Sequence, residues 1–379
     1  MEKANSLKEK LLNNTEIKNM LTKGSIIKYV MYALIGMTLL LFVVYILYKL
    51  RLKKKNNNQM RNGLNEISTK IKSIPYKEAS NPLRDYYVCS SYNSCCGGDF
   101  KNDFVDTGPL VQVINKGARL LDFEIYSVNN KPVVSASSQK SFNIKETYNS
   151  VPFSEVIDTI KMVAFSGATC PNPNDPLFIN LRIKSNNIKI YEEMANILKE
   201  NMGLKLLGKK YQYEAGGYGI VKEPLHNFLN KVIIICNDEN GNFRKVDAFH
   251  RLVNMSSSSI FLRELRYYDV LYTPDFKELI YHNKKNMTLV VPDLSVKDEN
   301  MNSNLLFKYG CQFNCMCFQN ADNLLKYYLE TFNEANHAFM LKPKQLRYVP
   351  VTINKPKEQD KAYSYAARTI DKPYFNALI

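Results

Sequence analysis

The chain has 379 residues and a formal net charge of +15 at pH 7. Its eight cysteines are sparse and unevenly spaced, which excludes a secreted disulfide scaffold and favours a reducing compartment. The positive charge favours anionic partners such as lipid headgroups, and nucleic acid is not expected, because no stretch interleaves aromatic and basic residues as RNA-binding segments do.

The first predicted element is a transmembrane helix at residues 29–48, after a short N-terminal tail at residues 1–28. No charged residue occurs from Tyr29 to Tyr48, and about 20 helical residues span the roughly 30 Å hydrocarbon core of a bilayer. A cleaved signal peptide would be shorter and would end at small residues. The alternative is a buried core helix, but the segment is apolar on all sides.

Basic residues crowd the C-terminal end of this helix: Lys49, Arg51, Lys53, Lys54, Lys55 and Arg61. Positive charge flanks the cytosolic end of membrane helices, so the large C-terminal domain is expected in the cytosol. Asn13, Asn254 and Asn286 each begin a glycosylation sequon, and a sugar on either of the last two would instead place the domain in a lumen. Residues 49–78, basic and rich in asparagine, are expected to form a linker.

Beyond the linker, short apolar runs alternate with helical patterns. We expect strands near 87–89 and at 120–126, 177–183, 231–236, 288–291 and 312–318, and helices at 152–165, 188–202 and 323–333. This alternation predicts an α/β fold with a parallel sheet, either a closed barrel or an open doubly wound sheet. The C-terminal tail at residues 351–379 contains lysine and proline and is expected to be loosely ordered.

The segment from Ile114 to Glu124 contains Lys116-Gly117-Ala118-Arg119 and then Asp122-Phe123-Glu124. It resembles the lysine-glycine, arginine, acidic-x-acidic element of phosphoinositide-specific phospholipases C. The family's order continues through Leu177–Arg182 and Tyr309–Phe313 and ends at Phe339–Arg347, which is similar to its closing lysine-proline motif. The resemblance implies a TIM-type (β/α)8 barrel over residues 79–350, X-like at 79–236 and Y-like at 250–350, with no room for the family's accessory domains.

The resemblance also implies where two catalytic histidines would stand. One assists attack by the inositol hydroxyl and the other protonates the leaving group, work that suits imidazole because its pKa lies near neutrality. Tyr92 replaces the first histidine and Ala136 the second. No catalytic residue is therefore expected at these positions.

The family's calcium site uses an asparagine and three carboxylates, which are hard oxygen ligands. Asn93, Asp122 and Glu124 occupy three of these positions, and a residual Ca²⁺ site would rest on them. Arg182 stands at the fourth, where a guanidinium disfavours Ca²⁺ and is expected to pair with Asp122 or Glu124. No cofactor is expected.

Residues that grip the substrate phosphate in the family are also replaced. Two lysines map to Ile235 and Asn237, an arginine maps to Leu289 and a tyrosine to Val291. Ser259 alone is expected to persist as a substrate-binding residue. Phosphate affinity should therefore be low.

Two functions remain. The leading hypothesis is a membrane-anchored, catalytically inactive phospholipase C-like protein that acts as a binding or structural module, with an unidentified protein partner. The rival is an active phosphoric diester hydrolase, independent of calcium, in which Tyr92 or Arg182 takes over part of the catalysis.

Other candidate sites are weaker. Four histidines, His226, His250, His282 and His337, are dispersed and have no nucleophile at a recognised spacing. Cys311, Cys315 and Cys317 follow a strand pattern and are expected to pack rather than to bind metal, and Cys95-Cys96 is expected on an exposed loop.

Overall fold

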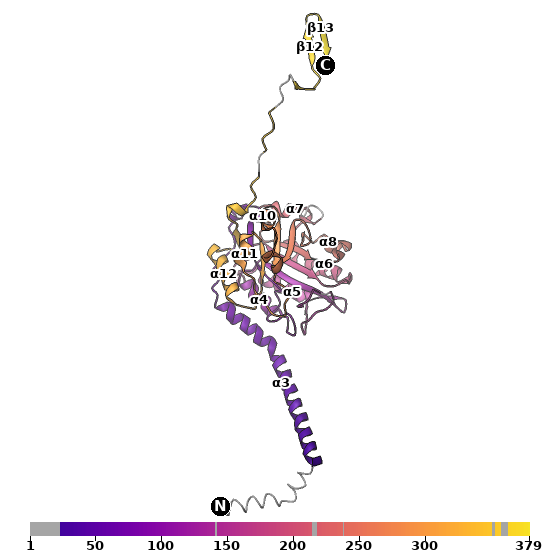
Figure 1. The fold of residues 1–379 in the computed structure, drawn as a ribbon, viewed down its shortest axis with the longest axis vertical. Helices are drawn as coiled ribbons and strands as arrows, with labels where there is room; N and C mark the ends of the chain where they lie inside the picture. The colour runs from indigo at the N-terminus through magenta and orange to yellow at the C-terminus, as the bar shows by residue number, and fades with distance from the viewer. Residues whose placement is uncertain (1–22, 141, 214–217, 238, 351–352, 358–362) are drawn as a thin grey trace, which may run out of the picture. The chain divides into compact units, whose positions relative to one another are not determined.

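The computed structural model describes residues 23–379 apart from 141, 214–217, 238, 351–352 and 358–362, so the N-terminal tail expected at 1–28 lies mostly outside the described residues. The chain divides into two compact units, Met1–Arg347 and Tyr348–Ile379. The first unit holds the long N-terminal helix and an α/β barrel (Figure 1).

Eight parallel strands form the barrel, in the ring order β1, β2, β5, β6, β7, β8, β9 and β10. Their bounds are β1 Tyr86–Ser91, β2 Leu120–Val128, β5 Leu177–Ile183, β6 Val232–Asn237, β7 Met255–Ser256, β8 Leu262–Arg266, β9 Met287–Val291 and β10 Phe313–Met316. No ladder joins β7 to β8 among the described residues, so the ring is nearly closed. This arrangement confirms the predicted barrel and excludes the open doubly wound sheet.

Helices lie between and after the strands. Their bounds are α4 Thr107–Asn115, α5 Phe153–Val163, α6 Lys189–Met202, α7 Tyr218–Lys222, α8 Asp247–His250, α9 Tyr267–Leu271, α10 Phe276–Lys285, α11 Ser303–Lys308 and α12 Asn323–Ala335. The longer ones are amphipathic: α5 buries Val156, Ile157 and Ile160 and leaves charged side chains outside. Three further strands extend the sheet, β3 Lys131–Ser135, β4 Val151–Pro152 and β11 Phe339–Leu341.

Aromatic side chains fill the interior of the barrel. The ring centroids of Phe178 on β5 and Phe313 on β10 lie 5.0 Å apart, and Phe178 also contacts Phe339 on β11. Because side chains alternate along a strand, the residues two and four positions after Phe178, Asn180 and Arg182, point to the same interior. The apolar part of the core thus gives way to a polar layer toward the carboxyl ends of the strands.

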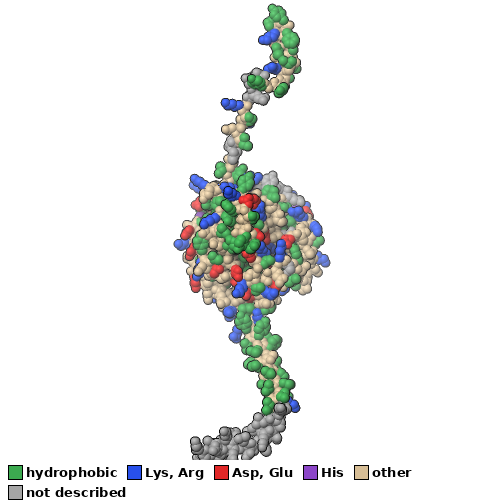
Figure 2. Space-filling model, in the orientation of Figure 1, with side chains coloured by type: hydrophobic (Ala, Val, Ile, Leu, Met, Phe, Trp, Pro, Cys, Tyr) green, Lys and Arg blue, Asp and Glu red, His purple; other side chains and the backbone are tan. Residues whose placement is uncertain are grey.

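The N-terminal helix α3 runs from Lys23 to Asn65. From residue 26 onward it is long and apolar enough to cross a membrane, and its apolar side chains between residues 26 and 48 are exposed (Figure 2). The alternative of a buried core helix is therefore wrong for this segment.

The second half of α3 corrects the prediction of a linker at residues 49–78. The helix continues through the asparagine-rich stretch to Asn65, and Leu52, Met60 and Leu64 are buried against the barrel. A Cβ atom on Gly63 would lie 2.7 Å from the Cβ of Ala321, so this glycine allows a close approach. Packing and hydrogen bonding on one face make this part of the helix a component of the domain.

Helix α3 docks on the loops that follow β1 and β10, at the carboxyl ends of the strands. Asn56 Nδ2 donates to Asp103 Oδ2 (2.6 Å) and Asn57 Nδ2 to Asp106 Oδ2 (2.9 Å), while Lys53 Nζ lies 3.1 Å from Asp106 Oδ1. Active sites of such barrels form at this end. The helix therefore attaches beside the mouth of the barrel.

The second unit corrects the prediction of a loosely ordered tail. It contains an antiparallel hairpin of strands β12 Thr369–Lys372 and β13 Phe375–Leu378.

Candidate functional site

The segment that contains Tyr92 and Asn93 lies directly after β1, at the mouth of the barrel. Asn93 has a positive φ of 41°, a left-handed conformation that asparagine tolerates. The ring of Tyr92 lies over the Arg182 guanidinium, with 4.5 Å between Cζ and the ring centroid. Tyr92 is buried, and burial raises the pKa of its hydroxyl to about 12. At neutral pH this side chain is a neutral stacking partner.

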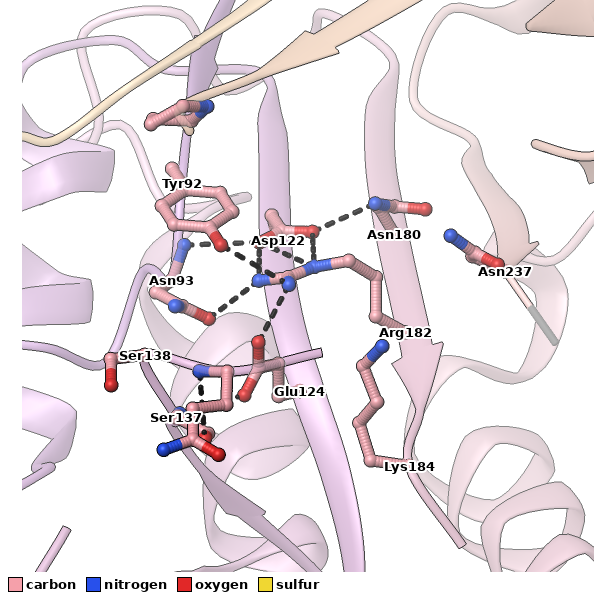
Figure 3. Close-up of polar contacts among 12 residues, drawn as sticks. Tyr92, Asn93, Asp122, Glu124, Ser137, Ser138, Asn180, Arg182, Lys184 and Asn237 are labelled. Carbon is pink, nitrogen blue, oxygen red and sulfur yellow. Dashed lines mark hydrogen bonds and ion pairs between the residues drawn. The ribbon is translucent and has the colours of Figure 1, made fainter. Parts of the chain in front are cut away.

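Arg182 forms the centre of the site (Figure 3). Its Nε donates to Asp122 Oδ1 (2.9 Å), and Nη1 donates to Glu124 Oε1 (2.7 Å) and to the Tyr92 hydroxyl (3.3 Å). Its Nη2 donates to Asp122 Oδ2 and Asn93 Oδ1, both at 2.7 Å. A guanidinium carries five N–H groups, so every donor of Arg182 has an acceptor.

The ion pairs expected of Arg182 are therefore present, with both carboxylates. Strand register explains the meeting: Glu124 on β2 pairs with Arg182 on β5, and Asp122 pairs with Asn180. Arg182 is 1% exposed. Burial alone would lower the pKa of Arg182, but the charges of Asp122 and Glu124 hold it well above its ordinary value. The buried guanidinium is thus paired with two buried carboxyl groups.

Further donors satisfy the remaining carboxylate oxygens. Asn180 Nδ2 donates to Asp122 Oδ1 (2.7 Å), and the Tyr126 hydroxyl and the Ser137 amide donate to Glu124 Oε2 (2.8 and 2.9 Å). Sequence reasoning missed Asn180 and Tyr126. Each lies two residues from a recognised site residue on the same strand, and the alternation of side chains could have found both.

Ala136, at the position of the second histidine, is fully buried after β3. The neighbouring serines hold a different carboxylate: Ser138 N donates to Glu146 Oε2 (2.8 Å), and Ser137 Oγ donates to the same oxygen (3.2 Å). Burial opposes the charge of Glu146, but hydrogen bonds from Ser138 and Lys101 outweigh it and lower the pKa of this carboxyl to about 2. Glu146 thus fixes the loop around Ala136.

The positions of the family's phosphate-gripping residues lie on β6 and β9. Ile235, Leu289 and Val291 are fully buried apolar side chains, and Asn237 Nδ2 donates to Glu264 Oε2 (2.7 Å). Burial raises the pKa of the Glu264 carboxyl. A carboxylate here repels a phosphate group.

Ser259, expected to bind substrate, lies in the turn before β8. Its Oγ accepts hydrogen bonds from the amides of Phe261 (3.3 Å) and Leu262 (3.2 Å). A nearby pocket of about 290 Å³ is instead lined by Lys140, Asn237, Glu239, Ser257, Ser258, Glu264, Leu265, Arg266 and Asp269. The structure therefore places two neighbouring serines at this pocket and uses the hydroxyl of Ser259 to support the turn.

Arg182, Tyr92, Asn93, Asp122 and Glu124 form a group that we call the arginine cluster. The loop between β1 and α4 packs against it. Phe100 in this loop is buried and packs edge-on against Tyr92, with ring centroids 5.4 Å apart. Its amide donates to the Val296 carbonyl (3.1 Å) in the loop after β9. Helix α3 holds the same loop from outside through Asp103 and Asp106. The residues at the calcium and histidine positions are consequently all buried.

The cysteines give one correction. All eight are buried free thiols, including Cys95 and Cys96, which were expected on an exposed loop. Both lie in the loop between β1 and α4, and burial raises the pKa of both thiols. Cys311, Cys315 and Cys317 pack in the core, as predicted. Among the described residues no group of three or more histidine, cysteine or carboxylate side chains could hold a metal ion.

The histidines remain dispersed and do not join this site. His282 Nε2 lies 3.2 Å from the Met287 carbonyl, and His337 Nδ1 lies 3.0 Å from the Lys72 carbonyl. His226 stacks on Tyr76. These contacts agree with the expected surface and core roles.

Part of the barrel is similar in sequence to known phospholipases C. Residues 79–236 match the family described as phosphatidylinositol-specific phospholipase C, X domain. The chain is 27% identical over 137 residues to 1-phosphatidylinositol 4,5-bisphosphate phosphodiesterase delta-3-A of Danio rerio, covering 35% of this chain and 16% of that protein. It is 28% identical over 153 residues to 1-phosphatidylinositol 4,5-bisphosphate phosphodiesterase 1 of Saccharomyces cerevisiae, covering 39% and 16%.

Solved structures share the fold. The crystal structures of PLC21 from L. pealei and from S. officinalis both align with a TM-score of 0.59, at 16% and 17% sequence identity, and cover 71% of this chain and 38% of theirs. The matched segment spans only 16% of the length of either curated relative. Residues 79–236 of the chain thus match the X domain of phosphatidylinositol-specific phospholipase C, and the barrel shares its fold with the two PLC21 structures.

Proposed function

We propose that this protein is a membrane-anchored, catalytically inactive phospholipase C-like barrel that acts as a binding or structural module at a membrane surface. The observation that carries the proposal is the Arg182 guanidinium, which is hydrogen-bonded to Asn93, Asp122 and Glu124, the remaining members of the family's calcium set. A positive charge thus sits among the ligands that would hold a metal ion.

Ca²⁺ does not fit these residues. Each side-chain oxygen that could ligate it already accepts a hydrogen bond, and the guanidinium supplies the positive charge that a cation would bring. Binding a metal ion would require Arg182 to leave, at the cost of exposing or unpairing a buried charge. We therefore derive no catalytic step through calcium.

Proton transfer is also unsupported. A general acid or base works best with a pKa near the operating pH, whereas the pKa of Tyr92 is raised to about 12 and Ala136 has no titratable group. No histidine contacts this cluster among the described residues. Neither half of the family's acid–base pair is replaced.

The rival function, an active hydrolase that uses Arg182 to stabilise a phosphorane, meets a specific obstacle. Phosphate recognition by arginine uses N–H groups that face the ligand. All five N–H groups of Arg182 are engaged inside the barrel, the ring of Tyr92 lies over the guanidinium, and Phe100 packs against that ring. We therefore favour the inactive form.

The membrane attachment rests on α3. Its exposed apolar half is followed directly by the half that packs beside the mouth of the barrel, so a membrane-embedded helix would hold that mouth close to the bilayer. The exposed basic residues Arg51, Lys54, Lys55 and Arg61 favour a cytosolic domain next to anionic lipid headgroups. Permanent attachment would take the place of reversible lipid binding.

The test of inactivity uses the full chain reconstituted in vesicles that contain phosphatidylinositol or phosphatidylinositol 4,5-bisphosphate. We expect no release of inositol phosphates with Ca²⁺ or with a chelator, while an active phospholipase C releases them from the same vesicles. Calcium-dependent release by this chain would overturn the proposal. Calcium-independent release that Arg182→Ala abolishes would support the rival.

Orientation needs a separate measurement. Asn254, one of the two sequons in the domain, is buried, and its Nδ2 donates to the Tyr211 carbonyl (3.0 Å), so a missing sugar there would say little about topology. Protease digestion of intact cells and of opened cells is more direct. We expect the barrel to be cleaved only after opening, and cleavage on intact cells would contradict a cytosolic domain.

A further inference from the structure

A polar cavity lies between α3 and the barrel, apart from the arginine cluster. Its volume is about 430 Å³, and we call it the seam pocket. One wall comes from α3, with Tyr48, Lys49 and Lys55, and the other from the loops at the mouth, with Asp99 and Asp298 among its residues. Nothing in the family comparison assigns a ligand to it.

Its position along α3 sets its depth relative to a bilayer. The uncharged stretch of the helix ends at Tyr48, where the pocket begins, and Leu52 lies about 6 Å farther at 1.5 Å per residue. The headgroup region on each side of a bilayer is roughly 5–7 Å thick. Tyrosines gather at the same level, as at membrane interfaces: Lys49 Nζ lies 4.8 Å from the ring centroid of Tyr148 and 5.6 Å from that of Tyr45. The pocket therefore opens where lipid headgroups lie.

The lining carries both signs of charge in equal number. Three ammonium groups and three carboxylates line it: Lys49, Lys55 and Lys101, and Asp99, Asp103 and Asp298. Two of the lysines belong to α3, whereas all three carboxylates belong to the barrel. A purely anionic headgroup would meet the carboxylates, and a purely cationic ligand would meet the lysines. A ligand with separated opposite charges fits both walls.

Part of this charge is already paired, and part is not. Lys101 Nζ lies 2.9 Å from Glu146 Oε1, Lys49 Nζ donates to the Asn102 carbonyl (3.3 Å), and Asp103 accepts from α3. For Lys55, Asp99 and Asp298 the described part of the chain offers no ion pair. These three groups, one on the helix wall and two on the barrel wall, are available to a ligand.

Among these three groups, Asp298 gives the strongest indication of the ligand. Burial, with the nearby carboxylates of Asp99, Asp103 and Asp322, raises the pKa of Asp298 to about 6. A partly buried carboxyl that lacks a cation is stabilised when an ammonium group binds beside it. A carboxylate accepts hydrogen bonds from a primary ammonium, whereas a quaternary ammonium has no N–H to donate.

We infer that the seam pocket binds the headgroup of a zwitterionic phospholipid with a primary ammonium, the phosphoethanolamine type. The phosphate lies toward Lys49 and Lys55 on α3, and the ammonium lies toward Asp99 and Asp298 on the barrel. The inference rests on the proposal that α3 spans a membrane, and it adds a lipid that ties the helix to the barrel.

The test is native mass spectrometry of the full chain in detergent, with phosphatidylethanolamine, phosphatidylcholine and phosphatidylglycerol of identical acyl chains added in equal amounts. We expect retained phosphatidylethanolamine to exceed each of the others by about tenfold, the ratio that one charge-assisted hydrogen bond supplies. Asp298→Asn should remove that preference. Lys55→Gln should lower retention of all three lipids, because each has a phosphate.

Matched controls are Asp247→Asn, at an exposed site on α8, and Lys28→Gln, at the opposite end of the apolar stretch, neither of which should change retention. Thermal unfolding without lipid checks that Asp298→Asn is folded. Equal retention of the three lipids, or an unchanged preference in folded Asp298→Asn, would overturn the inference. Equal competition by free phosphoethanolamine would show a soluble ligand and overturn the lipid assignment.

Failure of the anchor itself is measured separately. Carbonate extraction of vesicles that carry the full chain reports whether α3 is inserted. A chain released by carbonate overturns the membrane anchor, and the inference falls with it. A chain that resists extraction but shows no headgroup preference leaves the proposed function intact and removes the seam pocket ligand.

Discussion

Replacement of Arg182 by methionine isolates the charge at the centre of the barrel. Methionine is unbranched and apolar, so it fills much of the same space without any N–H group. Asp122 and Glu124 then remain buried without a cation. Breaking a buried ion pair by removing one partner costs about 3–5 kcal/mol. Asp122 keeps its bond from Asn180 and Glu124 keeps those from Tyr126 and Ser137, so the lower end, about 3 kcal/mol, is expected.

Thermal unfolding of the full chain in detergent measures this loss. At about 2–4 °C per kcal/mol for a domain of this size, the Tm of Arg182→Met should fall by roughly 10 °C. Arg263→Met is the matched control: Arg263 pairs with Glu278 at 3.0 Å on the surface, and the expected loss is within about 1 kcal/mol. Equal losses in the two variants would refute the assignment of Arg182 as a buried internal cation.

The charge-reversed variant Arg182→Glu tests whether the arginine at this position prevents Ca²⁺ binding. Arg182→Glu restores a fourth oxygen ligand beside Asn93, Asp122 and Glu124, and removes the guanidinium that binds them. We expect Ca²⁺ to raise the Tm of Arg182→Glu, by the stabilisation that follows from binding only the folded state, and to leave that of the unaltered chain unchanged. Stabilisation of the unaltered chain by Ca²⁺ would contradict the proposed function.

Three further outcomes follow from burial. The pKa of Asp298 is about 6 in the folded chain, against an ordinary value of 3.8, so the folded chain holds this proton more tightly than the unfolded chain. Stability should therefore fall as the pH rises between these two values. Measurement of Tm against pH should show this fall, and Asp298→Asn should make it smaller. Cys95 and Cys96, with raised thiol pKa values, should react with a thiol reagent only on unfolding, and rapid labelling of the native chain would contradict their burial. Leu64→Ala should lower the free energy of unfolding in urea by about 2–5 kcal/mol, because Leu64 is fully buried where α3 meets the barrel. A decrease below about 1 kcal/mol, which is typical of an exposed site, would argue against that docking.

Much of the barrel could be predicted from local pattern. The strand predicted at residues 177–183 coincides with β5, because a parallel strand buried on both faces is a continuous apolar run. The helix predicted at 188–202 matches α6 within one residue for the corresponding reason, an apolar stripe on one face. The pairing of Arg182 with carboxylates was also predictable, because the resemblance aligned it with a set of acidic residues.

Features that depend on distant contacts were not predictable in this way. The composition of the asparagine-rich stretch at residues 56–58 predicts a linker. The stretch is helical in the structure, where the side chains of Asn56 and Asn57 donate hydrogen bonds to Asp103 and Asp106. Cys95 and Cys96 read as a loop pair, yet they are buried because that loop is covered. Ser259 reads as a binding residue, yet its hydroxyl supports a turn.

The sequence by itself determined the exposed apolar helix and the alternation of strands with helices, because each depends on composition or on periodicity within one segment. The barrel and the residues at its mouth were expected only from the family resemblance. Only the tertiary structure decided that all five donors of Arg182 are engaged and that α3 docks beside the mouth. Both outcomes depend on where side chains from separate strands and loops meet. Strand register sets that meeting point, and residue order along the chain does not specify it.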